Sequence, residues 1–192
     1  ALRLFLVSTA SPDKDFAWSS KGIEGSARFV LRIVNYFKNV KIGKSSKKIE
    51  HKINFAVREI SKDIETLKYN FAVIHLRSLL ESLEEEISKK DLESVIKLIS
   101  PFCPHIAEEI WEMTGNKGFI SLETWPEADE SKIDDKLEEF EKALEKTVSD
   151  ILNVLRIVQE KQSNEAKKIY LYVMPDEKEK YNEEALSKRA GK

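Results

Sequence analysis

Apolar residues return every three or four positions in one segment of this chain after another, and that spacing predicts amphipathic helices. The first helix is expected over residues 22–37, after Ser19 or Ser20 as its N-cap. The apolar stripe expected for this helix consists of Ile23, Ala27, Val30, Leu31, Val34 and Phe37. A second helix is expected over residues 49–67, where aliphatic residues keep the same spacing. Several such stripes in a row favour an antiparallel helix bundle, which buries them against one another.

Further helices are expected before residue 116, and prolines and glycines mark their ends. A third helix covers residues 73–83 and is followed by an acidic run, residues 84–86. A fourth begins at Leu92 and is ended by Pro101 and Pro104, because a proline lacks the backbone donor that a helix needs. A fifth begins near Pro104, with Gly115 where a C-terminal glycine cap is usual. Residues 119–126 are expected to be extended.

The last third of the chain has a different pattern. Residues 131–162 predict one long helix whose apolar residues keep nearly heptad spacing. Residues 169–173 alternate aliphatic and tyrosine side chains, which predicts a strand, and residues 176–189 predict another helix. A lone strand needs a neighbour for its backbone groups. We therefore expect an all-α bundle and long helix, followed at residues 166–192 by the start of a truncated C-terminal α/β domain.

Charge is distributed unevenly along the chain. Residues 21–62 hold eleven basic and three acidic side chains, a net charge of +8, whereas the remaining residues carry −10. Such a basic stretch in an otherwise acidic protein is typical of a face that binds a polyanion. No apolar run approaches the ~20 residues of a membrane span, so no membrane partner is expected. The single cysteine, Cys103, allows no internal disulfide and fits the cytoplasm.

The sequence contains no recognisable catalytic constellation. Its three histidines, His51, His75 and His105, are scattered, and one cysteine cannot build a zinc cluster, so no metal site is expected. Residues 44–48 superficially resemble a lysine-serine ATP-binding loop, yet the residue order differs from that loop. A basic surface loop is the better interpretation of this segment.

The candidate binding residues lie on the polar side of the first helix and in the lysine-rich segment after it. Arginine guanidinium groups suit bidentate contacts with phosphate, and the flexible lysines that follow supply less directional charge. The predicted site consists of Arg28, Arg32, Asn35, Lys38, Lys41, Lys44, Lys47 and Lys48.

Three motifs carry a resemblance to a known family. The first spans residues 11–15 (SPDKD) and residues 18–32, which begin WSSKGIEG. The second is residues 100–111 (SPFCPHIAEEIW), and the third is residues 124–129 (TWPEAD). The first resembles the junction between the catalytic domain and the anticodon-binding bundle in leucyl-tRNA synthetases, a class I aminoacyl-tRNA synthetase family, and the other two resemble the end of that bundle, in the order and spacing found in the family. Residues 130–192 resemble the archaeal type more loosely.

The resemblance implies a domain organisation and a role. Residues 1–18 would end the catalytic and stem-contact region, residues 19–129 would form the anticodon-binding bundle, residues 130–165 the long connecting helix, and residues 166–192 the start of the C-terminal domain. The partner would be tRNA(Leu), held for leucylation by a catalytic domain that uses ATP and Mg. Because both ATP-binding signatures of that domain are absent here, we expect the chain alone to be inactive and to bind no cofactor. We also expect it to be a monomer.

Two alternatives remain open at this point. The isoleucyl, valyl and methionyl synthetases share the bundle, so the chain could be the same domain of one of these enzymes. The long helix could instead pair with another coiled coil in a non-enzymatic interaction scaffold.

Overall fold

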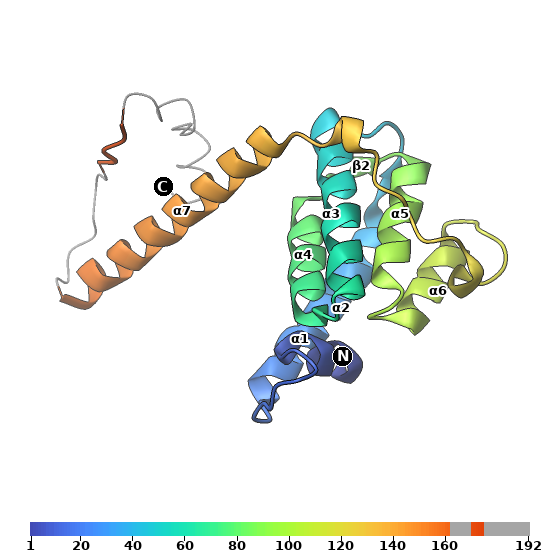
Figure 1. Ribbon diagram of the computed structural model, residues 1–192, viewed down its shortest axis with the longest axis horizontal. Helices are drawn as coiled ribbons and strands as arrows, with labels where there is room; N and C mark the ends of the chain where they lie inside the picture. Colours follow the sequence, from blue (N-terminus) through green and yellow to red (C-terminus); the bar gives the residue numbers. More distant parts are fainter. Residues whose placement is uncertain (162–169, 175–192) are drawn as a thin grey trace. The chain divides into compact units, whose positions relative to one another are not determined.

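A computed structural model describes residues 1–161 and 170–174, and most of this part is helical (Figure 1). Ala1–Ile133 and Asp134–Lys192 form two compact units, which are considered separately. The elements of the first unit are α1 (Leu2–Thr9), α2 (Ser20–Asn39), β1 (Lys41–Ile42), α3 (Lys47–Glu65), α4 (Tyr69–Ser82), β2 (Glu86–Ile87), α5 (Lys89–Ile99), α6 (Pro104–Met113) and the 3₁₀ turns η1 (Ile120–Leu122) and η2 (Glu130–Lys132). In the second unit the structure describes α7 (Asp135–Lys161). The all-α class expected from the sequence is confirmed.

Serine N-caps fix the starts of three helices in the bundle. The side chains of Ser19, Ser46 and Ser88 accept hydrogen bonds from backbone N–H groups in the first turns of α2, α3 and α5. Each bond satisfies a donor that has no partner inside the helix. At the other end of the bundle, Gly115 follows α6 with a φ of +82°, a conformation that favours glycine, so the predicted glycine cap is confirmed.

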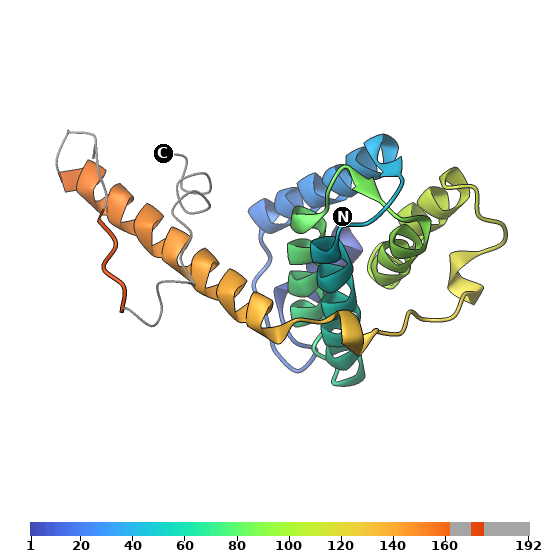
Figure 2. The same ribbon diagram turned by 90° about the horizontal axis from the view of Figure 1, so that it is seen from above.

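The hydrophobic core of the first unit is centred on α3, α4 and α5. Helices α3 and α4 lie side by side (Figures 1 and 2), and α5 packs beside α3. Ile49 and Ile60 of α3, Leu76 of α4 and Ile96 of α5 are completely buried. The second predicted stripe is therefore confirmed as core, apart from its last residue, Leu67, which lies exposed beyond the end of α3. A fixed core holds the polar faces of the helices in constant positions.

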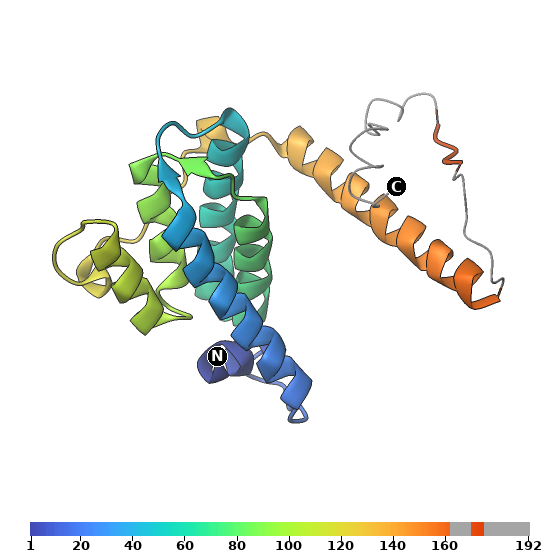
Figure 3. The same cartoon turned by 180° about the vertical axis from the view of Figure 1, so that it is seen from behind.

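The stripe predicted for α2 was wrong in its position around the helix. Phe29 and Ile33 are buried at 2% and 1% exposure, whereas Leu31 is 62% exposed. The segment from Phe29 to Phe37 is apolar at so many positions that two overlapping stripes fit it. In the fold, the stripe that contains Phe29, Ile33 and Phe37 is the one that joins the hydrophobic core. Figure 3 shows α2 crossing over α4 in the view from behind.

Short segments differ from the predictions in three places. Within the predicted lysine loop, Lys41 and Ile42 pair in parallel with Glu86 and Ile87, so a two-stranded sheet joins segments that are distant in sequence. The predicted extended segment contains η1, because the Glu108 carboxylate accepts hydrogen bonds from two consecutive backbone N–H groups there. The long helix begins at residue 135 rather than 131.

The strand predicted at residues 169–173 is not found over residues 170–173, the part of it that the structure describes. Residues 170–174 adopt neither helix nor strand, and Tyr172 is almost fully exposed. Ile169 and the predicted helix at 176–189 lie outside the described residues. Among the described helices, none is both long enough and apolar enough to cross a membrane.

Candidate nucleic-acid interface

The eight predicted site residues are all exposed, but they belong to two different surfaces. Arg28, Arg32, Asn35 and Lys38 lie on α2. The remaining lysines lie on β1, in the loop after it and in the first turn of α3. Their exposure leaves them accessible to a large polyanion, and their contact with tRNA remains a prediction.

One flank of α2 meets α4 and the residues just after it through three successive pairs, which we call the α2–α4 seam. The guanidinium of Arg77 lies 4.2 Å from the centre of the Phe29 ring. The next pair is an ion pair, with 2.7 Å between Arg32 Nη1 and Glu81 Oε1. In the third pair the Tyr36 hydroxyl donates to the backbone carbonyl of Glu84 over 2.9 Å. Because the numbers rise together on both helices, α2 and α4 run in the same direction along the seam.

Arg77 is a candidate binding residue that the sequence analysis missed. It lies on α4, outside the basic stretch from residue 21 to 62, and nothing in the local pattern connects it with Arg32. Burial against Phe29 lowers the pKa of Arg77, the nearby Glu81 carboxylate opposes that effect, and Arg32 adds to it. The one available signal was that Arg77 is the single arginine or lysine of α4.

Tyr36 closes the seam near the end of α2. Burial, and secondarily the negative charge of Glu84, raises the pKa of Tyr36 from 10.0 to about 12. A raised pKa means that the folded state favours the neutral phenol. The resulting stability is fully present below pH 10 and is lost as the pH rises toward 12. At neutral pH Tyr36 is therefore an uncharged hydrogen-bond donor, not a binding anion.

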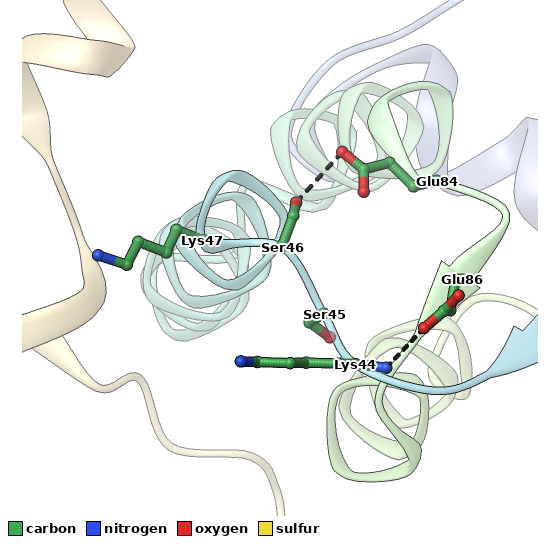
Figure 4. Close-up of a pocket in the computed structure, with 6 residues that line it drawn as sticks. All are labelled: Lys44, Ser45, Ser46, Lys47, Glu84 and Glu86. Atoms are coloured by element: carbon green, nitrogen blue, oxygen red, sulfur yellow. Dashed lines mark hydrogen bonds between the residues drawn. The ribbon is translucent and has the colours of Figure 1, made fainter.

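The loop between β1 and α3 is surrounded by carboxylates. The backbone N–H of Lys44 donates to Glu86 Oε1 over 2.9 Å, and the Ser46 hydroxyl donates to Glu84 Oε1 over 3.2 Å. Glycine at position 43 leaves room for this arrangement, since a Cβ there would clash with the Glu86 carboxylate unless that flexible side chain moved. Figure 4 shows the side chains of Lys44 and Lys47 pointing away from the two glutamates. The pocket of about 450 Å³ in this region is lined by both lysines and both glutamates, so basic and acidic side chains border it together.

The fold places acidic residues beside the predicted basic segment. The run at residues 84–86 follows α4, and β2 lies against β1 through the bonds from Lys41 N to Glu85 O and from Gly43 N to Ile87 O. Lysines of the loop thus have carboxylates on one side. This arrangement weakens the attraction of the loop for phosphate and gives the arginines of the seam more weight.

A buried polar network fixes the position of the loop. Ser45 and Ser88 both donate from their hydroxyls to Asp91 Oδ2, and the Ser88 backbone N–H donates to Ser45 Oγ over 2.9 Å. Asp91 lies in the first turn of α5, where the helix dipole favours a carboxylate. The loop therefore has one defined position relative to α5.

The histidines and the cysteine have structural surroundings. His51 is buried in α3, and His75 Nδ1 lies 2.8 Å from Asp63 Oδ2, while His105 is exposed. Cys103 is buried, and burial raises the pKa of its thiol. A search of the described residues finds no group of three or more side chains that could hold a metal ion.

Comparison with known proteins gives consistent results. Residues 46–171 match the family described as the anticodon-binding domain of tRNA ligase. The leucine–tRNA ligase of Rickettsia bellii is 33% identical over 147 residues, which is 70% of this chain and 18% of that protein. The leucine–tRNA ligase of Crocosphaera subtropica is 35% identical over 145 residues, 66% of this chain and 17% of that protein. The chain thus spans less than a fifth of the length of these relatives.

A solved structure resembles the fold as well. It is the ternary complex of an Agrobacterium radiobacter LeuRS with tRNA and LeuAMS, with a TM-score of 0.61, 18% identity and coverage of 69% of this chain and 20% of that one. At this identity the likeness shows the fold alone. The relatives named here are bacterial, so the archaeal type expected from the sequence finds no support among them.

Proposed function

This chain belongs to the anticodon-binding domain family of tRNA ligases, and on that premise we propose that it is the tRNA-binding helical domain of a leucine–tRNA ligase. The observation that supports this most is that its named relatives are leucine–tRNA ligases, matched over about two thirds of the chain. The domain holds tRNA(Leu) so that its acceptor end reaches a catalytic domain outside these residues. That catalytic domain uses ATP and Mg, and the assembly acts as a cytoplasmic monomer.

Binding in this proposal is positioning rather than reading. The exposed arginines of α2 contact phosphates of the tRNA backbone, which fix its orientation and carry no sequence information. Holding a reactant in place lowers the entropy cost of the reaction that follows. The leucine-specific relatives favour tRNA(Leu) over the substrates of the isoleucyl, valyl and methionyl enzymes. The family match extends across α7, which favours tRNA binding over the scaffold alternative.

The purified chain is expected to show neither leucine-dependent ATP–pyrophosphate exchange nor aminoacylation, because the two ATP-binding signatures are not in its sequence. A preparation from which the host synthetase has been removed, assayed beside a full-length leucine–tRNA ligase, checks this. Exchange well above the blank would show that the chain carries an activation site of its own, and the domain assignment would then be wrong.

Binding of tRNA(Leu) is expected to weaken steeply with salt, with a log–log slope of about 0.7–0.9 per phosphate contact. Replacing Arg28 and Arg32 together by alanine is expected to reduce the affinity by about tenfold, since two charged phosphate donors are lost. Both side chains are exposed, so the variant should fold normally. Filter binding across a salt series measures both quantities.

The control for this variant is a pair of basic residues elsewhere on the surface, Lys14 and Lys117, replaced together by alanine. Affinity of the arginine variant equal to that of the wild type would exclude α2 as the binding surface. Strong dependence on the anticodon bases would instead favour a sibling enzyme that reads them.

A further inference from the structure

We propose that Arg77 of α4 binds a backbone phosphate of tRNA at the α2–α4 seam, together with Arg32 of α2. This inference rests on the proposed function and adds to it a residue outside the basic stretch. It also moves the centre of the interface from the lysine loop to the place where α2 and α4 meet.

The first support is the way in which Arg77 is held. Its guanidinium lies 4.2 Å over the ring of Phe29, which is itself buried in the core. Contact with a fixed ring restricts the position of the guanidinium group, which keeps N–H donors at its edge for another acceptor. A partly buried arginine with one preferred orientation is prepared for a planar acceptor, because little conformational entropy remains to be lost on binding.

The second support is that Arg77 has no hydrogen-bond acceptor among the residues that the structure describes. Within residues 1–161 and 170–174, no hydrogen bond or ion pair is found for its N–H groups. Leaving a partly desolvated charged donor without a partner is unfavourable. The free energy that a ligand oxygen would recover here is therefore larger than at an exposed lysine.

Arg77 differs in its charged partners from Lys97 and Arg58, which also lie over aromatic rings. Lys97 lies 5.6 Å from the ring centre of Trp111, and its Nζ also has the Glu123 carboxylate at 3.3 Å. Arg58 lies over Phe55 in the same way and pairs with two carboxylates. In the part of the chain that the structure describes, each of these two cations has an internal anion. Arg77 lies over an aromatic ring but, among the described residues, has no carboxylate in hydrogen-bond or ion-pair contact; Glu81 acts on it only through its charge.

Glu81 competes with the proposed phosphate for Arg32. Its carboxylate is bound to Arg32 at 2.7 Å, and both side chains of that pair are more than half exposed. An exposed ion pair contributes little to stability, so a phosphate can replace the carboxylate on Arg32 at small cost. Arg32 and Arg77 are also close enough to influence each other electrostatically. A phosphate between them would relieve that repulsion, whereas Glu81 competes with it.

The ligand that this chemistry fits is a phosphodiester of RNA. Two guanidinium groups from neighbouring helices match the tetrahedral oxygens of a phosphate. The neighbouring arginine Arg28, also exposed on α2, extends the positive charge along the helix, as a polymer of regularly spaced phosphates requires.

Filter binding of a tRNA(Leu) transcript to the full chain across a salt series tests the proposal. Arg77→Met keeps an unbranched side chain over Phe29 and removes the charge. It is expected to weaken binding about fivefold to twentyfold and to reduce the log–log salt slope by about 0.7–0.9, the value for one phosphate. The tRNA affinity of Arg77→Lys, which keeps the charge without the planar fork, is expected to lie between the affinities of the wild type and of Arg77→Met. Glu81→Gln is expected to strengthen binding severalfold.

The matched control is Lys97→Met, which removes from α5 a cation that also lies over an aromatic ring. It should leave affinity and slope unchanged. Wild-type affinity and slope in Arg77→Met would overturn the proposal while leaving the proposed function intact. A purely structural role for Arg77 would lower the melting temperature without changing the salt slope, and that result would also overturn it.

A second measurement decides the question if the wild-type chain fails to bind tRNA, the outcome that would contradict the proposed function. The Arg77 Nε–H resonance is followed by NMR during titration with tRNA(Leu), inorganic pyrophosphate and polyglutamate. A shift of this resonance with pyrophosphate supports a phosphate site. A resonance that moves with neither phosphate probe overturns the site, and a larger response to polyglutamate overturns its assignment to RNA.

Discussion

Replacing Phe29 by alanine is expected to lower the free energy of unfolding by about 3–5 kcal/mol, the usual cost of removing a buried aromatic side chain. Phe29 is 2% exposed and belongs to the continuous core of the first unit. Its loss would leave a cavity between α2 and α4 and would remove the ring beneath Arg77. Both effects act at the same place, so stability and tRNA affinity should fall together. Urea denaturation followed by circular dichroism measures the first effect, and filter binding measures the second.

Leu31→Ala is the matched control for this variant. Leu31 lies two residues further along α2 and is 62% exposed, so its truncation is expected to change the free energy of unfolding by less than about 0.5 kcal/mol. The pair also tests which side of α2 faces the core. A larger loss in Leu31→Ala than in Phe29→Ala would mean that the stripe first predicted from the sequence is the buried one, and the α2–α4 seam would then be wrong.

Replacing Asp91 by alanine is expected to lower the free energy of unfolding by about 2–4 kcal/mol, because several hydrogen bonds to one charged, buried acceptor are lost. Ser45 and Ser88 would both keep a buried hydroxyl without its carboxylate partner. The bonds join the loop before α3 to the start of α5, so the loop should also become mobile. Faster amide hydrogen exchange at Lys44 and Ser46 would report that change.

Ser94→Ala controls for the substitution of a polar residue in α5. The Ser94 side chain is partly exposed and donates only to the Lys90 carbonyl one turn earlier, so little change in stability is expected. Ser45→Ala should reproduce part of the loss seen in Asp91→Ala. Equal stability of the wild type and Asp91→Ala would show that the network contributes nothing to the position of the loop.

The two expected effects concern the two halves of the candidate interface. Phe29 supports the arginines of the seam, and Asp91 fixes the loop that carries Lys44 and Lys47. Glu84 and Glu86 both accept hydrogen bonds from the loop, whereas the exposed Arg32–Glu81 ion pair of the seam is weak, so we expect damage to the seam to weaken tRNA binding more. Comparing tRNA affinity in the two variants, under conditions where both remain folded, ranks the two surfaces.

The sequence by itself determined the features of this protein that depend on neighbouring residues. Ser19 begins α2, Pro104 begins α6 and Gly115 follows its end, because capping and proline or glycine geometry act within one turn of a helix. The family resemblance likewise needed only linear motifs. The exposure of Arg28 and Arg32 followed from their place among polar residues on a helix that had been predicted correctly.

Tertiary structure alone decided how those elements face one another. It chose Phe29 over Leu31 for the core, brought Glu84 and Glu86 beside the lysine loop, and placed Arg77 next to Arg32. The hydrogen bonds of the seam join residues 48 and 49 positions apart, so no local pattern contains them. Helical periodicity fixes the spacing of side chains around one helix, but the rotation of that helix is set by the partner that removes its apolar side from water.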